Sequence, residues 1–360
     1  MARPSGGGRL TLRATWPIPN EESALLNLAE TLREAGLLGE GAVAHGGPDE
    51  LLLLSGGPSG DDSEVTLLAG PPTLRITSAQ PPRSLQPESK STASALEGEL
   101  DLAPPSTGCD WRVESWSRHG WQRRLTVQQP DLASALRSLE PLLPEVNEGA
   151  SGLSAGGLAG LLTYDLVQWT EPVRLRNLPL PGALLGVLYR CDRWLLHNRT
   201  LGTLSLLSTT EDDWSRLCEE EVARWISSSR IDGRARSRDT FASSNITDQE
   251  HSEVVDEVRA AIGQGQFYQL NFGRIWSGMI TDPWQVFRRL SETNPAPYSG
   301  WLQVPDHNFA LASASPELLL SIDGDSISTR PIKGTRPRGR TRDEDEASMR
   351  ELAATRKEVA

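Results

Sequence analysis

The side chains best suited to chemistry gather in the C-terminal third of the 360-residue chain. Lys333 stands between Pro331 and Gly334, on a backbone that is stiff on one side and open on the other. A lysine lodged in a pocket can lose its charge and become a nucleophile. Gly334 and Thr335 offer N–H groups and a hydroxyl that could hold a carboxylate, with Arg336 nearby as a cationic donor. The alternative is a basic surface turn with a solvated lysine.

Three other short motifs accompany this lysine. Ser315-Pro316-Glu317 places a carboxylate directly after a turn, and Gln269 could donate and accept hydrogen bonds without titrating. The segment from Asn294 to Tyr298 carries two prolines. Taken singly, these motifs are equally typical of an exposed turn, an ordinary strand amide and a packed loop.

Composition limits the functions that these residues can serve. With 36 basic and 48 acidic residues the net charge is −12, which argues against an extended nucleic-acid-binding surface and favours small molecules or proteins as partners. The three cysteines are widely spaced, so neither a disulfide framework nor a cysteine zinc site is expected. No apolar run approaches the roughly 20 residues of a spanning helix, and the first fifteen residues lack the apolar core of a signal peptide. We therefore expect a cytoplasmic protein without membrane or nucleic-acid partners.

Hydrophobic patterning predicts mixed helix and strand content in residues 1–240, the N-terminal region. A helix over residues 20–38 would begin at an Asn20 cap, and two strands would form a hairpin around residues 56–60. Residues 71–108, rich in Pro, Ser and Thr, suggest a disordered surface excursion. The other elements expected here are a helix over residues 131–143 and strands over residues 51–55, 65–69, 184–189 and 194–196.

The C-terminal region, residues 241–360, follows a polar stretch over residues 224–239 that carries five arginines and is the best linker candidate. Beyond it, Thr247 and Glu250 match a capping box. The helix that follows would place its apolar side chains on one face: Val254, Val255, Val258, Ala261 and Ile262. The expected strands are residues 267–276, 309–313 and 318–322.

Taken together and in order, these motifs resemble the chorismate-utilising enzymes, which include anthranilate synthase component I, aminodeoxychorismate synthase component I, and the isochorismate and salicylate synthases. The resemblance lies in Phe267–Phe272, Asn294–Tyr298, Ala312–Glu317 and Pro331–Gly339, and more weakly in three N-terminal stretches. It implies an α+β fold with two similar subdomains, antiparallel sheets packed face to face and helices outside, of which the C-terminal part would be missing. Pattern alone supports only mixed α and β content in non-alternating order.

Two positions sort the reactions within this family. The water-adding members are expected to have lysine where this chain has Gln269, and the ammonia-using members have glutamine. Anthranilate synthases typically have alanine where this chain has Lys333. The chain therefore looks most like aminodeoxychorismate synthase component I, which makes 4-amino-4-deoxychorismate for p-aminobenzoate and folate synthesis. The alternatives are anthranilate synthase component I, and a non-catalytic truncated paralogue that binds the amidotransferase or tryptophan.

The resemblance also implies a role for each residue. Glu317 would protonate the departing C4 hydroxyl of chorismate, and Lys333 would attack C2 as a neutral amine. Gly334 and Thr335 would hold one substrate carboxylate, and Mg²⁺ would bind the other. Gln269 would contribute to substrate binding, and ammonia would come from a separate glutamine amidotransferase subunit. The sixteen-residue spacing of Glu317 and Lys333 suits adjacent antiparallel strands that face one pocket.

A second pocket is implied for tryptophan. In related enzymes it lies between N-terminal strands and the Asn-Pro-x-Pro-Tyr segment, which corresponds here to Ser55 with Asn294, Pro295, Pro297 and Tyr298. Ser55 follows four leucines, whereas tryptophan-sensitive relatives usually have Leu-Leu-Glu-Ser, which argues against feedback inhibition. The alternatives are a structural role for bound tryptophan and a packed turn.

The implied magnesium site begins at the last residues of the chain. The family has a Lys-Glu-x-x-Glu-His helix whose two glutamates share one face, and here only Lys357 and Glu358 of that pattern are present. We expect the isolated 360-residue chain to have no significant chorismate-converting activity and to be poorly soluble, because its metal site and part of its sheet would be absent. Magnesium-dependent turnover by the purified chain at a rate typical of an enzyme would refute this expectation.

Overall fold

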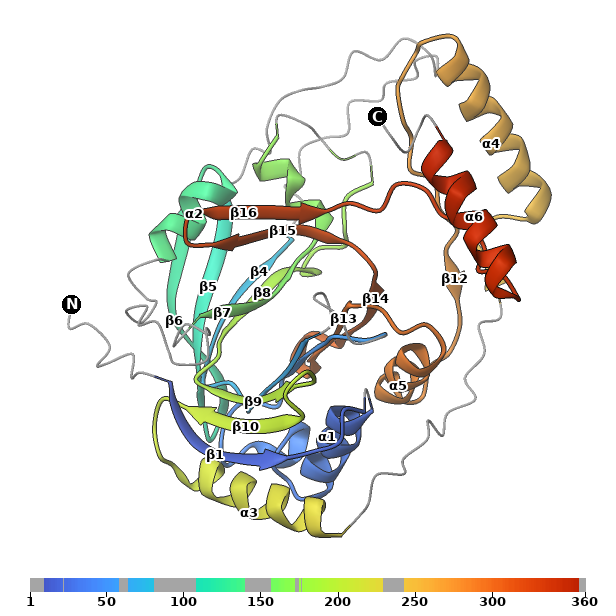
Figure 1. Cartoon of the computed structure of the whole chain (residues 1–360). Helices are drawn as coiled ribbons and strands as arrows, with labels where there is room; N and C mark the ends of the chain where they lie inside the picture. The colour runs from blue at the N-terminus through green and yellow to red at the C-terminus, as the bar shows by residue number, and fades with distance from the viewer. Residues whose placement is uncertain are drawn as a thin grey trace.

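The computed structural model describes residues 10–21, 23–57, 64–80, 108–139, 157–171, 175, 177–228 and 243–355 (Figure 1). Three predictions fall wholly or largely outside these residues: the Pro/Ser-rich excursion beyond residue 80, the linker beyond residue 228, and the metal ligand Glu358. No helix in the described part of the chain is long and apolar enough to cross a membrane.

A seven-stranded antiparallel sheet forms the centre of the fold, and strands from both ends of the sequence build it. Its order is β1-β10-β9-β3-β2-β13-β14. The strands are β1 Thr11–Pro17, β2 Glu50–Leu54, β3 Val65–Ala69, β9 Arg193–Asn198, β10 Thr203–Ser208, β13 Tyr298–Val304 and β14 Phe309–Ser315. Because β13 pairs with β2, the C-terminal region completes a sheet that the N-terminal region begins.

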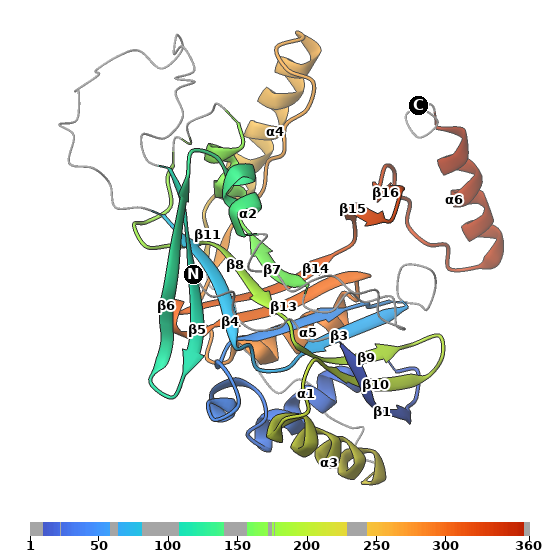
Figure 2. The same cartoon turned by 90° about the vertical axis from the view of Figure 1, so that its left-hand side faces the viewer.

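A five-stranded antiparallel sheet lies against the first, with the order β6-β5-β4-β8-β7. Its strands are β4 Leu74–Ala79, β5 Cys109–Ser117, β6 Gly120–Gln129, β7 Leu158–Leu162 and β8 Leu184–Arg190. The two sheets share a buried cluster in which Val187 and Tyr189 of β8 pack with Leu196 of β9 and Leu302 of β13. Figure 2 shows the five-stranded sheet standing against the seven-stranded one.

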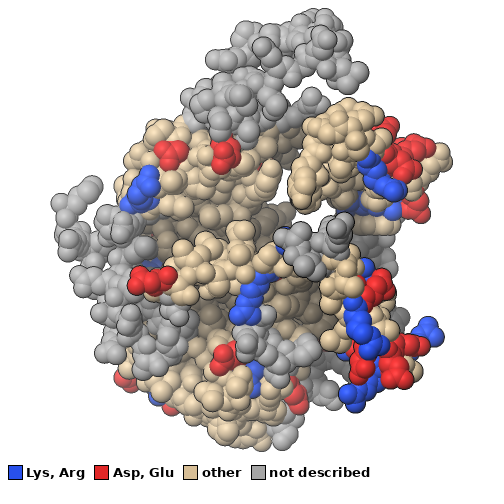
Figure 3. All heavy atoms as spheres, turned by 45° about the horizontal axis from the view of Figure 1, so that its top comes forward, with Lys and Arg blue, Asp and Glu red and all other residues tan. Residues whose placement is uncertain are grey.

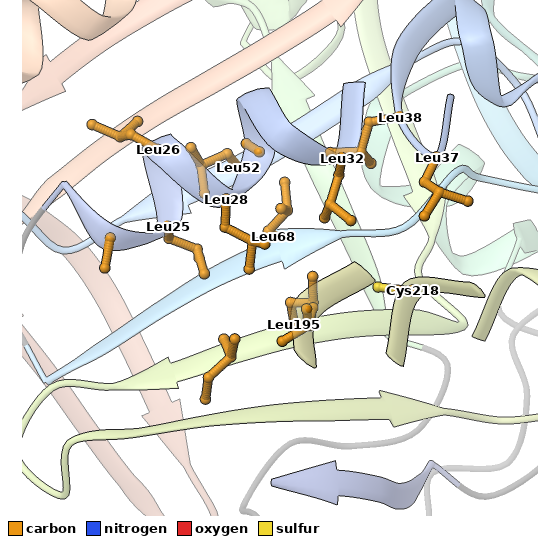
Figure 4. Packing of buried hydrophobic residues seen from close by; sticks show 14 of the residues in the cluster. Leu25, Leu26, Leu28, Leu32, Leu37, Leu38, Leu52, Leu68, Leu195 and Cys218 are labelled. Atoms are coloured by element: carbon orange, nitrogen blue, oxygen red, sulfur yellow. The ribbon is translucent and has the colours of Figure 1, made fainter. Parts of the chain in front are cut away.

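Helices cover the outer faces of both sheets. The seven-stranded sheet is covered by α1 Ala24–Glu34, α3 Asp213–Ser227 and α5 Pro283–Thr293, and their apolar faces meet the strands in a cluster that includes Leu28 and Leu68 (Figure 4). The five-stranded sheet packs against α2 Leu132–Leu139 and the 3₁₀ helix Tyr164–Trp169. Two face-to-face sheets with helices outside confirm the predicted α+β class.

The remaining elements project from one side of these layers (Figure 1). They are α4 Asp248–Gly263, the short strands β11 Ser243–Ser244 and β12 Trp276–Ser277, the hairpin β15 Leu318–Asp323 with β16 Ser326–Arg330, and α6 Arg342–Ala354. The capping box predicted for Thr247 and Glu250 is present in full at the start of α4. None of the α4 residues is buried.

Most predicted elements are confirmed, and three predictions are wrong. Asn20 does not cap α1, which begins at Ala24; its side-chain oxygen instead accepts a hydrogen bond from Arg199 at 3.2 Å. The start of the predicted excursion is the structured strand β4, the middle strand of its sheet. Residues 267–275 are not a strand, because no other strand of the described chain pairs with them.

One buried guanidinium connects the two sheets. Arg75 of β4 donates to Asp49, just before β2, at 3.0 Å, to Glu114 of β5 at 2.8 Å, and to Asp306, just after β13, at 2.8 Å. Tyr189 donates a further bond of 2.8 Å to Asp49. Burial alone would lower the pKa of Arg75, but the surrounding carboxylates raise it on balance. Burial raises the pKa of Asp49, and Arg75 opposes that rise.

We predict that Arg75→Met lowers the free energy of unfolding by about 3–5 kcal/mol at pH 7.5, because it leaves Asp49 buried without its cation. The loss should become smaller as the pH is lowered, because the raised pKa of Asp49 favours protonation of the buried carboxyl. Arg75→Met with Asp49→Asn should recover part of the loss. Urea unfolding measures both effects. The control is Arg112→Met on exposed β5 surface, and equal losses in Arg75→Met and Arg112→Met would contradict the prediction.

Candidate functional site

Three adjacent strands, β2, β13 and β14, have termini at the same end of the seven-stranded sheet, and this brings the predicted motifs together. Ser55 directly follows β2, whose Leu54 pairs with Ser299 of β13. Tyr298, the first residue of β13, pairs with Ser315, the last residue of β14. Glu317 lies two residues further along the chain. The predicted tryptophan segment and the predicted catalytic acid therefore lie at one end of the sheet.

Hydrogen bonds with β3 and with Arg199 hold the loop after β2 in place. Ser55 N–H donates to the Thr66 hydroxyl at 3.1 Å, and the Ser55 hydroxyl donates to the carbonyl of Val65 at 2.5 Å. Arg199 donates to the carbonyl oxygens of Ser55 at 2.7 Å and Gly57 at 3.0 Å. Gly57 adopts φ +82°, a conformation that favours glycine. The hydroxyl of Ser55 thus forms a hydrogen bond with the neighbouring strand, while its carbonyl accepts a hydrogen bond from a cationic side chain.

The Asn294–Tyr298 segment leads from α5 into β13 and packs against that loop. Gly56 N–H donates to the Ala296 carbonyl at 2.9 Å, and the Ser299 hydroxyl donates to the same oxygen at 2.9 Å. Ala296 is buried, whereas Asn294 and Pro295 are exposed and Pro297 and Tyr298 are half-buried. The structure therefore brings Ser55 close to the other residues predicted for the tryptophan pocket. This geometry is compatible with both a binding surface and the packed turn.

Glu317 and Lys333 flank the same end of the β15–β16 hairpin. Leu318 pairs with Arg330, so Glu317 immediately precedes this pair and Lys333 comes three residues after it. The two antiparallel strands are present, but Glu317 lies just before β15 and Lys333 lies beyond the end of β16. Both side chains are exposed, and neither forms an ion pair or a side-chain hydrogen bond among the described residues. The hairpin places an acid and an amine at one end without enclosing them.

Two arginines that follow Lys333 have partners on α6. Arg336 donates to Glu351 at 3.0 Å, and Arg338 donates to Asp345 at 2.8 Å. The backbone N–H of Gly339 also donates to Asp345, and this bond, together with Arg338, holds the pKa of that carboxyl below its usual range. Gly334 is half-buried and Thr335 is exposed, so the carboxylate-binding role of these two residues stays a prediction.

Gln269 lies on the exposed segment after α4. Its amide donates one hydrogen bond of 3.4 Å, to Asn271, and no interaction joins it to Glu317 or Lys333. The sequence placed Gln269 on a strand, and the structure does not.

A cleft of about 390 Å³ opens elsewhere, between α1, α5 and the end of β13, and neither Glu317 nor Lys333 lines it. Several of its charged groups pair with one another. Arg33 pairs with Glu50 and lies 3.6 Å from the ring centre of Trp284, and Glu30 pairs with Arg288. The cleft is therefore separate from the predicted catalytic residues.

The resemblance implies a Mg²⁺ site, and the described residues show how much of such a site they form. Among them, no three His, Cys, Asp or Glu side chains lie close enough together to hold a metal ion. Glu358 lies outside the described residues. The described part of the chain thus does not form the implied site by itself.

Sequence reasoning missed two residues that shape this sheet edge, Arg199 and His197. Arg199 follows the apolar strand β9 and reaches back over 140 positions to the Ser55 loop, a contact without a local sequence signal. His197 of β9 pairs with Thr66 and is only 1% exposed. Burial and the nearby Arg199 charge lower the pKa of His197 to about 4, so it is neutral at physiological pH.

Comparison with known proteins identifies the class of the chain. Residues 90–360 match a protein family described as "chorismate binding enzyme". Aminodeoxychorismate synthase component 1 of Salmonella typhimurium is 35% identical over 210 residues, and that of Bacillus subtilis is 30% identical over 213 residues. Each match covers 57% of this chain and 44% or 45% of the relative. Anthranilate synthase component 1 of Thermus thermophilus is 31% identical over 214 residues.

A solved structure agrees in fold. Anthranilate synthase component I from Streptococcus pneumoniae superposes with a TM-score of 0.53 at 16% sequence identity, covering 84% of this chain and 59% of that one. The chain belongs to the chorismate binding enzyme family. It spans less than half the length of the curated relatives that it matches.

We predict that the free energy of unfolding falls by up to about 3 kcal/mol between pH 6.5 and 4 because of His197 alone. In this window the unfolded chain binds a proton that the folded chain excludes, since the pKa of His197 is about 4 when folded and 6.5 ordinarily. Urea unfolding across this range should show a flatter pH dependence for His197→Gln. The control is exposed His119→Gln, which should keep the wild-type slope; an unchanged slope in His197→Gln would refute the prediction.

Proposed function

We propose that this chain carries the chorismate-binding region of an aminodeoxychorismate synthase component I. The enzyme would convert chorismate and ammonia to 4-amino-4-deoxychorismate, the precursor of p-aminobenzoate and folate. The observation that carries the proposal is that the Leu318–Arg330 pair closes one end of the β15–β16 hairpin, with Glu317 one residue before it and Lys333 three residues after it. Membership in the chorismate binding family and the two aminodeoxychorismate synthase relatives support it.

The proposed chemistry uses an acid and a nucleophile on one substrate. Glu317 donates a proton to the C4 hydroxyl of chorismate, which leaves as water. The neutral amine of Lys333 attacks C2 as the ring double bonds shift, forming a C–N bond to the enzyme. Ammonia then attacks C4, the double bonds shift back, and the bond to Lys333 breaks. Glutamine at position 269, where water-adding members have lysine, suits the use of ammonia.

The other proposed groups act on the charges of the substrate. The Gly334 N–H and the Thr335 hydroxyl hold one carboxylate. Glu358 would contribute to binding Mg²⁺, which would supply positive charge to offset the other carboxylate. The ammonia is supplied by a glutamine amidotransferase subunit, and tryptophan binds beside Ser55, Asn294 and Tyr298.

Anthranilate synthase component I is the second candidate. The relative from Thermus thermophilus and the matching solved structure favour it, because both carry that name. Lysine at position 333 separates the two proposals, since the aromatic product of anthranilate synthase does not require a covalent lysine adduct.

We predict that a hybrid, in which this chain is continued by the C-terminal region of the Salmonella typhimurium relative, forms a covalent adduct at Lys333 on incubation with chorismate and Mg²⁺. Peptide mass spectrometry should locate the adduct, and Lys333→Ala should lack it. Lys90→Ala is the control for unspecific labelling of amines. Product analysis with ammonia separates the candidates: 4-amino-4-deoxychorismate supports the proposal, and anthranilate without an adduct refutes it.

A further inference from the structure

Strand β6 is the outer strand of the five-stranded sheet, and its outer edge is open. It pairs with β5 on one side, and no other described strand pairs with it. The side chains in the middle of the strand, residues 122–126, are all exposed. The strand is ten residues long. Such an edge presents a row of backbone N–H and C=O groups to which an extended peptide can be added.

The β5–β6 hairpin carries positive charge that the described part of the chain does not neutralise. Four exposed arginines lie on it: Arg112, Arg118, Arg123 and Arg124. None of them forms an ion pair with a described residue, and Arg124 donates to a neutral acceptor, the Ser115 hydroxyl, at 2.6 Å. Of the two acidic residues of the hairpin, Glu114 pairs with Arg75, and Asp110 lies at the end away from the turn.

The register of the hairpin places a cation and an apolar side chain on opposite faces of β6. Arg123 pairs with Glu114, and Arg112 shares the face of Glu114 because one residue separates them. Leu125 pairs with Val113, which is buried in the core beneath the other face. Leu125 itself is 37% exposed. A strand added beside β6 therefore meets arginines along one face and an uncovered leucine on the other.

The hairpin is a local positive surface on an acidic chain. The net charge of the whole chain is −12. Figures 1 and 2 both place β6 on the opposite side of the sheets from α6. In Figure 3 the acidic side chains gather most densely on the side of α4 and α6. A partner that carries carboxylates is therefore attracted to the hairpin and repelled by the opposite side of the molecule.

We propose that β6 binds an extended acidic segment of another protein, in which acidic residues alternate with apolar or β-branched ones. The backbone of the segment pairs with the outer edge of β6. Its carboxylates face Arg123 and the neighbouring Arg112, and its apolar side chains lie beside Leu125. A nucleic acid could neutralise the arginines, but it offers no backbone groups that complete a sheet edge. This inference concerns a surface outside the candidate site and does not rest on the reaction proposed above.

A second copy of the chain fits this edge less well. Pairing the β6 edges of two copies would bring two sets of arginines together, and like charges on paired strands are destabilising. The exposed acidic elements of the described chain, α4 and α6, are helices and cannot be added as strands. The occupant is therefore a segment of a different protein.

The test uses a fluorescein-labelled peptide of eight residues in which glutamate alternates with valine. Fluorescence anisotropy with the full chain should show saturable binding. The binding should weaken about tenfold as sodium chloride rises from about 50 mM to about 500 mM, because salt screens the charge pairs. Hydrogen exchange of the β6 amides should slow at least tenfold when the peptide is saturating, because the added strand pairs with the outer edge.

The variant Arg123→Glu with Arg124→Glu should weaken peptide binding at least tenfold in Kd. Its matched control is Arg216→Glu with Arg259→Glu, which reverses two exposed arginines on α3 and α4 and changes the net charge equally. A second peptide, in which glutamate alternates with proline, keeps the charge but lacks N–H groups for strand pairing, and it should bind at least tenfold more weakly. Thermal unfolding checks that both double variants are folded.

Four outcomes would overturn the proposal. If the glutamate–proline peptide binds as tightly as the glutamate–valine peptide, no strand is added. If a single-stranded DNA octamer binds as tightly, the hairpin is a general surface for anions. If the two double variants weaken binding equally, the contact lies elsewhere. If the chain dimerises and protects the β6 amides without peptide, a second copy is the occupant. None of these readouts depends on catalysis, so failure of the proposed function leaves the test intact.

Discussion

A single buried charge determines how the two sheets lie against each other. Arg75 can be removed from water only because carboxylates surround it, and those carboxylates come from both sheets. Trp121 of β6 lies 4.3 Å from the guanidinium and covers it. Separating the sheets would leave the charge without Asp49 and Asp306. The apolar layer between the sheets contributes buried surface, which stabilises their packing. Arg75 fixes the geometry, because its hydrogen bonds are satisfied only when β2 and β13 meet β4 in one arrangement.

This constraint reaches the candidate site through the strands themselves. Asp49 and Asp306 lie at one end of the β2–β13 pair, and Ser55 and Tyr298 lie at the other. Because the strands are continuously paired, fixing one end fixes the register of the other. Arg199 then sets the Ser55 loop, and β14 leads on to Glu317. The acid and the tryptophan segment are thus positioned by the same sheet.

Local pattern predicted the elements whose partners are close in sequence or whose burial is strong. The β2–β3 hairpin, strand β8 and the capping box of Thr247 followed from residue types alone. The strand predicted over residues 267–276 failed because a strand needs a neighbour as well as a period. Strand β4 was missed because the Pro- and Ser-rich composition around it outweighed a short apolar run.

The residues of the candidate site also fall into two groups, those that local motifs indicate and those that only long-range contacts reveal. Glu317, Lys333 and Gln269 could be chosen by type and by resemblance, because motifs are local. The functions of Arg75 and Arg199 could not, since each joins segments more than a hundred residues apart. Burial of His197 likewise depends on which strands cover it. Long-range contacts decide the electrostatics of this fold, and a single sequence does not show them.

The order of strands also matters during synthesis. Strand β2 is made early, but β13, its neighbour on one side, is made more than two hundred residues later. At ribosomal rates of roughly 5–20 residues per second, the edge of β2 stays open for on the order of tens of seconds on the nascent chain. Its leucines are exposed to chaperones and to other nascent chains throughout that time. The seven-stranded sheet, which both ends of the sequence build, is therefore completed long after the five-stranded sheet.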